Sequence, residues 1–329
     1  IIAMAELTYR EALNQALKEE MQRDSRVMIM GEEVAFYQGT YKVTKNLLAE
    51  FGEKRVKDTP ISEEIIVGTA IGAAMTGLRP VAELMTINFS LLAMDQIVNN
   101  AAKIYFMFGG QCNVPLVIRS PQGTGKQLGA QHSQQLEAYF THCPGIYVVA
   151  PSTPADAKGL LKTCIRDNNP VIFIEDQDLY SMKGTVPTGE HLLPLGKAQI
   201  VREGDELTII SYSKSVHDCL KAAERLEEEG ISAEVIDLRC LNPLDKNTIF
   251  NSVKKTRLAV VVNRAWRTGS FAAEIASLIT ENCFEYLDAP VVRVSAEDII
   301  APYNKTLEQS IFPHSQDIVN SCLKLIRGE

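Results

Sequence analysis

Long apolar runs, paired cysteines and an excess of positive charge are all missing from this chain of 329 residues. No uninterrupted apolar stretch approaches the roughly 20 residues of a membrane-spanning helix. The seven cysteines are scattered without a Cys-x-x-Cys pair, which disfavours a disulfide framework or a zinc site and predicts buried thiols in a reducing compartment. The net charge of −8 argues against a nucleic-acid-binding surface. Residues 1–5 lack the charged and apolar regions of a signal peptide, and the origin of the first three stays open.

Short apolar segments alternate with longer amphipathic ones along the whole chain. This spacing predicts parallel, doubly wound α/β sheets. The periodicity is lost over 177–194, so we expect a connection there between a domain of residues 1–190 and a smaller one of residues 191–329. The expected strands of the two domains are 27–30, 80–85, 115–119, 148–150 and 170–174, then 207–212, 233–238, 258–262 and 291–294.

The most informative stretch begins at Glu63. Glu63 and Glu64 follow a turn and precede an almost uncharged run, residues 65–77, which predicts a helix of about four turns with Ser62 as its N-cap and Gly77 as its stop. Because the run is apolar on every side, we expect the helix to be buried on every side, with Glu63 at its N-terminal end. On these residues alone, a solvated first turn favoured by the helix dipole remains the plainer alternative.

The segments after this helix carry further candidate residues. The strand at 80–85 runs into Asn88-Phe89-Ser90, at the position where α/β sheets bind ligands. Residues 91–108 predict one long helix. A glycine-rich stretch, 120–129, is interpreted as a mobile loop near the site, and His132 is expected to enter a helix that continues to about Phe140.

Six motifs occur in an order that is specific to one family: Thr59-Pro60-Ile61-Ser62-Glu63, residues 72–80, Asn88-Phe89-Ser90, residues 129–134, residues 166–170 and Leu287-Asp288-Ala289-Pro290. Together they resemble the beta subunits of thiamine-diphosphate-dependent 2-oxo acid dehydrogenases, with pyruvate dehydrogenase as the nearest member. The resemblance implies a transketolase-like pyrimidine-binding domain, a transketolase C-terminal-like domain, and oxidative decarboxylation of pyruvate with acetyl transfer to a lipoyl group. Branched-chain 2-oxo acid and acetoin dehydrogenases share the motifs. A non-catalytic structural partner subunit is the alternative of another class.

The resemblance also implies roles for particular residues. Glu63 would hydrogen-bond the ring nitrogen of the cofactor's aminopyrimidine, with Glu64 as its rival. Phe89 would pack against the pyrimidine while Leu84 and Met85 line the same slot, although plain core packing explains these three equally simply from periodicity. His132 would orient or protonate the enamine or the incoming lipoyl group, against the alternative of a structural histidine.

Cations and partners follow from the same resemblance. A potassium site would use mostly backbone carbonyls, and an ordinary helix-end turn is the equal alternative; the expected contributors are Leu116, Cys164, Ile165, Asp167 and Asn169. The chain lacks the Gly-Asp-Gly segment with which thiamine enzymes hold magnesium and the diphosphate. An alpha subunit would therefore supply that half of the site, in a heterotetramer of two alpha and two beta subunits.

The C-terminal domain would contact the lipoyl-bearing dihydrolipoyl acetyltransferase of a multienzyme complex. Asn263-Arg264 stand there where family members commonly carry acidic residues, which changes the charge of that contact. The compartment stays open between plastid stroma, mitochondrial matrix and bacterial cytoplasm.

Overall fold

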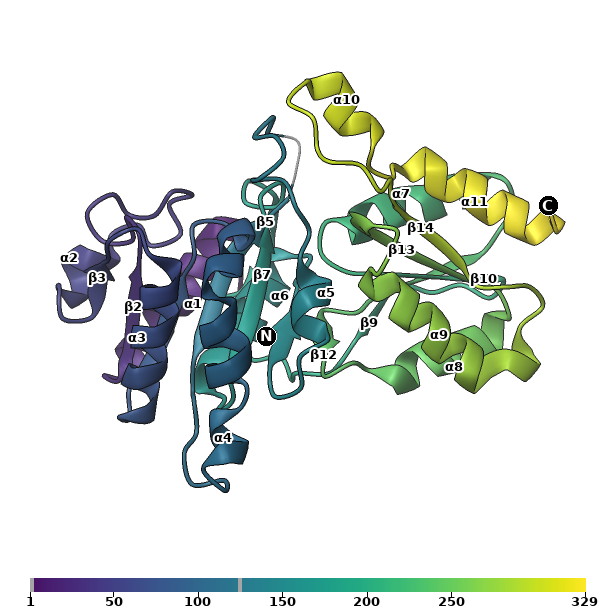
Figure 1. Cartoon of the computed structure of the whole chain (residues 1–329). Helices are drawn as coiled ribbons and strands as arrows, with labels where there is room; N and C mark the ends of the chain where they lie inside the picture. The colour runs from purple at the N-terminus through teal and green to yellow at the C-terminus, as the bar shows by residue number, and fades with distance from the viewer. Residues whose placement is uncertain (1–2, 124–125) are drawn as a thin grey trace. The chain divides into compact units, whose positions relative to one another are not determined.

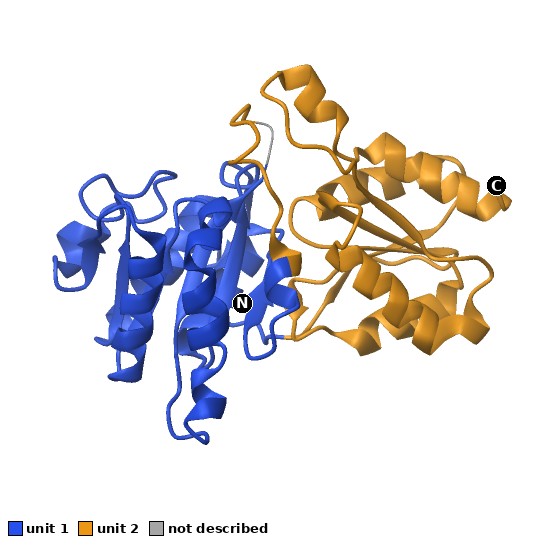
Figure 2. Cartoon of the chain, in the orientation of Figure 1, with its two compact units in different colours: residues 1–123, 139–195 blue, residues 124–138, 196–329 orange. Residues whose placement is uncertain are grey.

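The computed structural model describes residues 3–123 and 126–329. The chain divides into two compact units (Figure 2): unit 1 comprises 1–123 and 139–195, and unit 2 comprises 124–138 and 196–329. Each unit contains one parallel-stranded sheet with helices on both faces. The expected architecture of two α/β domains is thereby confirmed.

Within unit 1 the strand order is β6-β7-β5-β4-β2-β3, and every neighbouring pair is parallel. The strands are β2 (Val27–Gly31), β3 (Val56–Asp58), β4 (Arg79–Glu83), β5 (Val117–Gln122), β6 (Tyr147–Val149) and β7 (Val171–Asp176). All residues of β2, β5 and β7 are buried. Buried, continuously apolar strands are typical of a sheet covered by helices on both sides, which is why these segments show no alternation in sequence.

Two helical layers cover this sheet (Figure 1). α1 (Tyr9–Arg23) and α6 (Pro154–Arg166) pack together on one face, and α3 (Glu63–Met75) packs with η1 (Ile87–Ala93) and η2 (Asp95–Ala101) on the other. The capping box predicted at the start of α1 is present, since Thr8 and Glu11 satisfy each other's backbone groups. The short helices are α2 (Leu47–Phe51), α4 (Ile104–Met107) and α5 (Glu137–Thr141).

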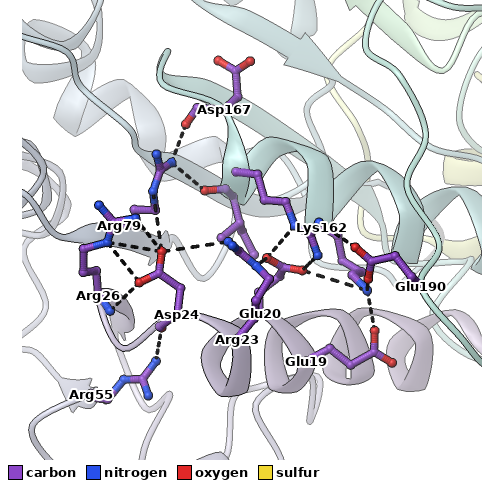
Figure 3. A network of polar contacts seen from close by, with 12 residues as sticks. Glu19, Glu20, Arg23, Asp24, Arg26, Arg55, Arg79, Lys162, Asp167 and Glu190 are labelled. Carbon is purple, nitrogen blue, oxygen red and sulfur yellow. Dashed lines mark hydrogen bonds and ion pairs between the residues drawn. The ribbon is translucent and has the colours of Figure 1, made fainter.

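A network of charges joins α1 to α6 (Figure 3). Glu20 on α1 is fully buried, and its carboxylate accepts hydrogen bonds from Arg166 at 2.6 and 2.9 Å and from Arg23 at 2.7 Å. Lys162 on α6 lies between Glu19, at 2.6 Å, and Glu190, at 2.8 Å. Each buried charge therefore has a partner of opposite sign, which is what makes its burial tolerable.

In unit 2 the strand order is β14-β13-β10-β11-β9, parallel except for the edge strand β9. α7 and α11 pack on one face of the sheet, and α8 and α9 pack together on the other (Figure 1). The strands are β9 (Gln199–Arg202), β10 (Leu207–Ser211), β11 (Ala233–Asp237), β13 (Ala259–Trp266) and β14 (Val292–Ala296). The main helices are α7 (Ser215–Glu228), α8 (Lys246–Thr256), α9 (Phe271–Cys283) and α11 (Ser315–Arg327), and the short elements are β12 (Cys240–Asn242), η3 (Phe284–Tyr286) and α10 (Lys305–Ser310).

The single long helix predicted over 91–108 is wrong. The segment is instead a 3-10 turn, η1, a π-helical turn, η2, and the short α4. Amide side chains explain the change, because they compete with regular α-helical bonding. Asn99 donates to the Asp95 carboxylate at 2.7 Å, while the amide N–H of Ala102 reaches back five residues to the carbonyl of Ile97.

Residues 177–194 also contain an element that loss of periodicity did not predict. β8 (Lys183–Pro187) pairs antiparallel with β1 (Met4–Thr8) in a separate two-stranded sheet. Six of the seven cysteines are buried as predicted, and Cys112 is half-buried. Among the residues that the structure describes, no helix is long and apolar enough to cross a membrane.

Candidate functional site

Glu63 is the first residue of α3, and it is only 3 % exposed. Ser62 precedes it in extended conformation at the N-cap position, although its side chain accepts no capping hydrogen bond. Glu64 is exposed. The Glu63 carboxylate forms no hydrogen bond or ion pair with any other residue in the described parts of the chain, so the buried acid at this helix start is Glu63 and not its neighbour.

A second buried carboxyl group, on Glu32, lies close enough to Glu63 to respond to its charge. Glu32 follows directly after β2 and is 7 % exposed, and its Oε1 has no hydrogen-bond partner among the described residues. Burial raises the pKa of Glu32, and the charge of Glu63 raises it further. Sequence reasoning missed this residue, although an acid directly after a fully buried strand of a parallel sheet is a signal for the ligand-binding edge.

The predicted slot residues lie on the segment between β4 and η2. Leu84 is fully buried, whereas Met85 and Phe89 are half-buried. Leu84 is fixed to β5, since its N–H donates to the Arg119 carbonyl at 3.1 Å and its own carbonyl accepts from Ser120 at 3.0 Å. η1, which carries Phe89, packs against α3. Glu63 and Phe89 therefore sit on neighbouring elements, and Met85 and Phe89 keep accessible apolar surface.

A buried cluster of charged side chains lies at the start of this segment. Arg119 on β5 is 1 % exposed and donates to both carboxylate oxygens of Glu175 at 2.7 and 2.6 Å, and also to Glu83 at the end of β4. The Tyr180 hydroxyl donates to Glu175 at 2.6 Å. Burial raises the pKa of Glu83, and the Arg119 charge opposes that rise. The cluster lies where three parallel strands end, immediately before Leu84.

His132 lies in the part of the chain that belongs to unit 2. The helix expected to contain it begins only at Glu137, so that part of the prediction is wrong. His132 instead occupies a turn, with its N–H donating to the Gly129 carbonyl at 3.3 Å; Gly129 has a φ of +75° and lies so close to the Tyr303 ring that a side chain would not fit. Of the stretch interpreted as a mobile loop, residues 120–122 belong to β5, and residues 124–125 lie outside the described residues.

α3 is not buried all round, which corrects the expectation from its composition. One face lies against the sheet, but Ile65 is 58 % exposed and Met75 38 % exposed. Gly68 faces the Gln96 side chain, while a side chain at Gly72 would meet nothing within 4 Å. An apolar helix with one open face is typical of a surface that another chain covers.

Four of the five residues expected at the potassium site lie at the C-terminal end of α6 or just after it: Cys164, Ile165, Asp167 and Asn169. The carbonyls of Ile165 and Asp167 accept hydrogen bonds from one nitrogen of Arg79 at 3.0 and 2.8 Å, and the Asn168 side chain accepts from another at 2.6 Å. Figure 3 shows the contact between Arg79 and Asp167. The Asp167 N–H also closes the helix onto Thr163 at 3.0 Å.

The other members of this set have protein partners as well. The Leu116 carbonyl accepts from Val171 at 2.8 Å, the Cys164 carbonyl accepts from Asp167 at 3.3 Å, and Asn169 donates to the Asp167 carboxylate at 2.8 Å. No group of three or more His, Cys, Asp or Glu side chains in the described residues could hold a metal ion. Arg79 therefore already supplies a positive charge to two of the expected carbonyls, those of Ile165 and Asp167.

Comparisons with known proteins agree with this architecture. Residues 5–183 match the transketolase pyrimidine-binding domain, and residues 196–318 match the transketolase C-terminal domain. A solved chain described as a split-gene transketolase, inactive beta4 tetramer, shares the fold with a TM-score of 0.81 at 21 % identity; the match covers 98 % of this chain and 99 % of that one.

Similarity in sequence extends over nearly the full length of several curated proteins. A pyruvate dehydrogenase E1 component subunit beta from Gracilaria tenuistipitata var. liui is 49 % identical, with 98 % of this chain and 100 % of the relative aligned. The mitochondrial subunit of the same name from Caenorhabditis elegans is 48 % identical over 98 % of this chain and 93 % of its own. The Rickettsia bellii subunit is 48 % identical over 97 % and 98 %. The chain belongs to the family of pyruvate dehydrogenase E1 component beta subunits, built from transketolase-like pyrimidine-binding and C-terminal domains.

Proposed function

We propose that this chain supplies the pyrimidine half of a thiamine diphosphate site in a pyruvate dehydrogenase that transfers acetyl groups to lipoyl. The observation that carries the proposal is the buried Glu63 carboxyl group at the start of α3, which, like the Oε1 of Glu32, has no hydrogen-bond partner among the described residues. A buried carboxyl with no protein partner fits a ligand that presents a ring nitrogen to it. Met85 and Phe89, which are half-buried, fit the apolar face of the same ring.

Glu63 would hold a proton between its carboxyl group and the pyrimidine ring nitrogen. Thiamine diphosphate, when bound, supplies the electron sink on which a 2-oxo acid loses carbon dioxide. Glu32 would provide a second buried carboxyl group beside that of Glu63, and its pKa is raised by burial and by the charge of Glu63. Leu84, Met85 and Phe89 would keep water away from the pyrimidine and fix its plane. His132 would orient or protonate the group that receives or delivers the acyl unit.

An alpha subunit is the proposed partner, and it would bring magnesium and the diphosphate-binding half. Exposed apolar side chains of unit 1 support this proposal. Besides Ile65 on α3, Leu92 on η1 is 64 % exposed and Phe106 on α4 is 87 % exposed. Large apolar side chains left exposed are typical of a surface that a partner covers. A heterotetramer of two alpha and two beta subunits satisfies closed twofold symmetry.

The lipoyl-bearing dihydrolipoyl acetyltransferase is the second proposed partner, at the C-terminal domain. Asn263, one of the two residues that depart from the family's acidic pattern, is fully buried within β13, so it does not change the surface. Arg264 is half-buried over the Phe312 ring at 5.1 Å. The relatives come from bacteria, mitochondria and a red alga, and we propose one of the corresponding compartments.

The substrate is tested by coexpressing this chain with its alpha subunit and assaying decarboxylation with an artificial electron acceptor. We expect pyruvate to be preferred over 2-oxoisovalerate by about tenfold or more, since even one or two methylene groups alter binding by that factor. The chain alone should be inactive. With a lipoyl group as the acceptor in place of the dye, His132→Asn should lower the rate of lipoyl acetylation by a larger factor than it lowers dye reduction. A preference for 2-oxoisovalerate would move the chain to the branched-chain enzymes, and activity without a partner would refute the shared site.

Potassium is proposed as a further ligand at the carbonyls of Leu116, Cys164, Ile165, Asp167 and Asn169. If it binds, potassium chloride should raise the melting temperature more than sodium or choline chloride does at equal ionic strength, because a ligand of the native state stabilises it by mass action. Arg79→Gln should enlarge the difference by removing the competing charge. Identical melting curves in the three salts, for wild type and for Arg79→Gln, would contradict the proposal that potassium binds at this turn.

A further inference from the structure

A hollow of about 420 Å³ in unit 1 is lined by more positive than negative charge. We call it the α1 hollow; its lining residues are Arg10, Glu11, Asn14, Gln38, Lys42 and Lys45. Three come from the first two turns of α1 and three from the loop between β2 and α2. Because three of the six are cationic and only one is acidic, two positive charges are in excess in a chain whose net charge is −8.

Glu11, the one acidic residue that lines the α1 hollow, uses its carboxylate to cap the start of α1. Glu11 accepts hydrogen bonds from the backbone N–H of Thr8 at 2.8 Å and from its hydroxyl at 2.6 Å. These hydrogen bonds lower the pKa of Glu11, so it stays ionised at neutral pH. It therefore cannot be the neutralising partner of all the cations around it.

None of the three cations forms an ion pair with a carboxylate in the described parts of the chain. Arg10 donates to the Tyr180 carbonyl at 3.2 Å and to the Ser181 hydroxyl at 2.7 Å. Lys42 donates to the Tyr37 carbonyl at 2.6 Å, with its ammonium 3.4 Å from the centre of the Tyr37 ring. The Lys45 ammonium has no hydrogen-bond partner among the described residues. The cations are positioned by neutral groups and keep their charge available.

A second hollow of unit 1 has its cations paired with carboxylates, so the lack of ion pairs among the described residues distinguishes the α1 hollow. The second hollow, of about 360 Å³, also contains three cations, Arg23, Lys162 and Arg166. There every cation is paired with a carboxylate, from Glu19, Glu20 or Glu190 (Figure 3). That hollow is electrostatically satisfied, whereas the α1 hollow is not.

The local backbone adds to the preference for an anion. The positive end of the dipole of α1, a helix of 15 residues, lies at Arg10 and Glu11, while the N–H groups of this first turn already donate to neighbouring residues. The loop is held in place on the other side, since Asn14 donates to the carbonyls of Val43 at 2.6 Å and Lys45 at 3.1 Å. The amide oxygen of Gln38 accepts from Asn46 at 3.0 Å, which leaves its amide hydrogens for a ligand.

We infer that the α1 hollow binds a small organic phosphate. A phosphate monoester is a dianion near neutral pH and matches the two excess positive charges. Lysine and arginine side chains bind phosphate as a point charge and as a planar fork, respectively. The volume falls within the roughly 300–1,000 Å³ of small-molecule sites, which is more room than the phosphate group alone requires. This site uses no residue of the proposed thiamine site.

Binding can be measured on the full chain by calorimetry, with glycerol 3-phosphate as the probe and glycerol as the uncharged control. We expect a dissociation constant in the roughly micromolar to millimolar range for the phosphate ester and no binding of glycerol. Lys45→Glu should weaken binding by about tenfold or more, because it reverses a charge that has no structural partner. The matched control is Lys54→Glu, at an exposed lysine outside the hollow, and it should leave binding within about twofold of wild type.

Two further measurements keep the inference open to refutation. Lys45→Gln removes the charge without adding repulsion, and it should weaken binding by less than Lys45→Glu while leaving the melting temperature unchanged. Saturating thiamine, which carries the pyrimidine but no phosphate, should not displace the probe. Absence of binding to wild type, equal losses in Lys45→Glu and Lys54→Glu, or displacement by thiamine would each overturn the assignment. No outcome depends on catalysis, so failure here is distinguishable from failure of the proposed function.

Discussion

Glu63→Gln lowers pyruvate decarboxylation by the complex with the alpha subunit by about 10²–10⁴-fold, the usual contribution of a positioned acid–base group. The amide keeps the size and the hydrogen-bonding capacity of the side chain, but it cannot exchange a proton with a ring nitrogen. Glu63 is 3 % exposed with no protein partner among the described residues, so the substitution breaks no internal contact. The loss should therefore appear in kcat, with an unchanged melting temperature.

Glu64→Gln is the matched control for this prediction, because it makes the same chemical change one residue along the same helix. Glu64 is exposed, and we expect its activity to stay within about twofold of wild type, as is usual for surface substitutions. Full activity in Glu63→Gln, or equal losses in both variants, would contradict the assignment. Glu32→Gln should give a smaller loss than Glu63→Gln, since Glu32 acts through the charge of Glu63 and not on the cofactor itself.

Arg119→Met destabilises the chain by about 3–5 kcal/mol, because it leaves two buried carboxylates without their counter-charge. Burial alone would lower the pKa of Arg119, but the charges of Glu175 and Glu83 outweigh it and raise the pKa. Without the guanidinium, both carboxyl groups lose their charged donor, and only the Tyr180 hydroxyl still donates to Glu175. Urea denaturation monitored by circular dichroism measures the change in the free energy of unfolding.

The same substitution at an exposed ion pair provides the control. Arg257 pairs with Asp288 at 2.5 Å, and both side chains are more than half exposed, so Arg257→Met should destabilise the chain far less than Arg119→Met. The triple variant Arg119→Met, Glu83→Gln, Glu175→Gln should recover part of the loss, since it removes the uncompensated charges too. A loss in Arg119→Met no larger than in Arg257→Met, or no recovery in the triple variant, would show that the cluster is not a coupled unit.

Structural features that depend only on residues close together in the sequence could be predicted from it. The Thr8–Glu11 capping box and the alternation of buried strands with helices gave the start of α1 and the α/β class, because these signals depend on near neighbours alone. The η2 turn could not be predicted, because its backbone hydrogen bonding depends on a side-chain contact. The amide of Asn99 can donate either to the Asp95 carboxylate, as it does here, or to solvent. β8 was missed because its register depends on β1, far away in sequence.

The sequence likewise indicated only part of the candidate site. Glu63 could be identified as a candidate because an uncharged helix follows it, but the composition of that helix does not indicate which face of α3 is exposed. Glu32 belongs to the site only through its distance from Glu63, which the parallel arrangement of β2 and β3 creates. The cations of the α1 hollow likewise come from two distant segments, since Arg10 and Lys42 are 32 positions apart, so no local motif could reveal them.

The most direct test of the account is the rate at which the proton on carbon 2 of bound thiamine diphosphate exchanges with deuterium, measured by acid quench and proton nuclear magnetic resonance in the complex with the alpha subunit. This step needs neither pyruvate nor lipoyl, so it isolates the contribution of the pyrimidine carboxyl group. If Glu63 holds that carboxyl, exchange slows by about 10²-fold or more in Glu63→Gln and is unchanged in Glu64→Gln. Wild-type exchange in Glu63→Gln, at full cofactor occupancy, would contradict the central claim.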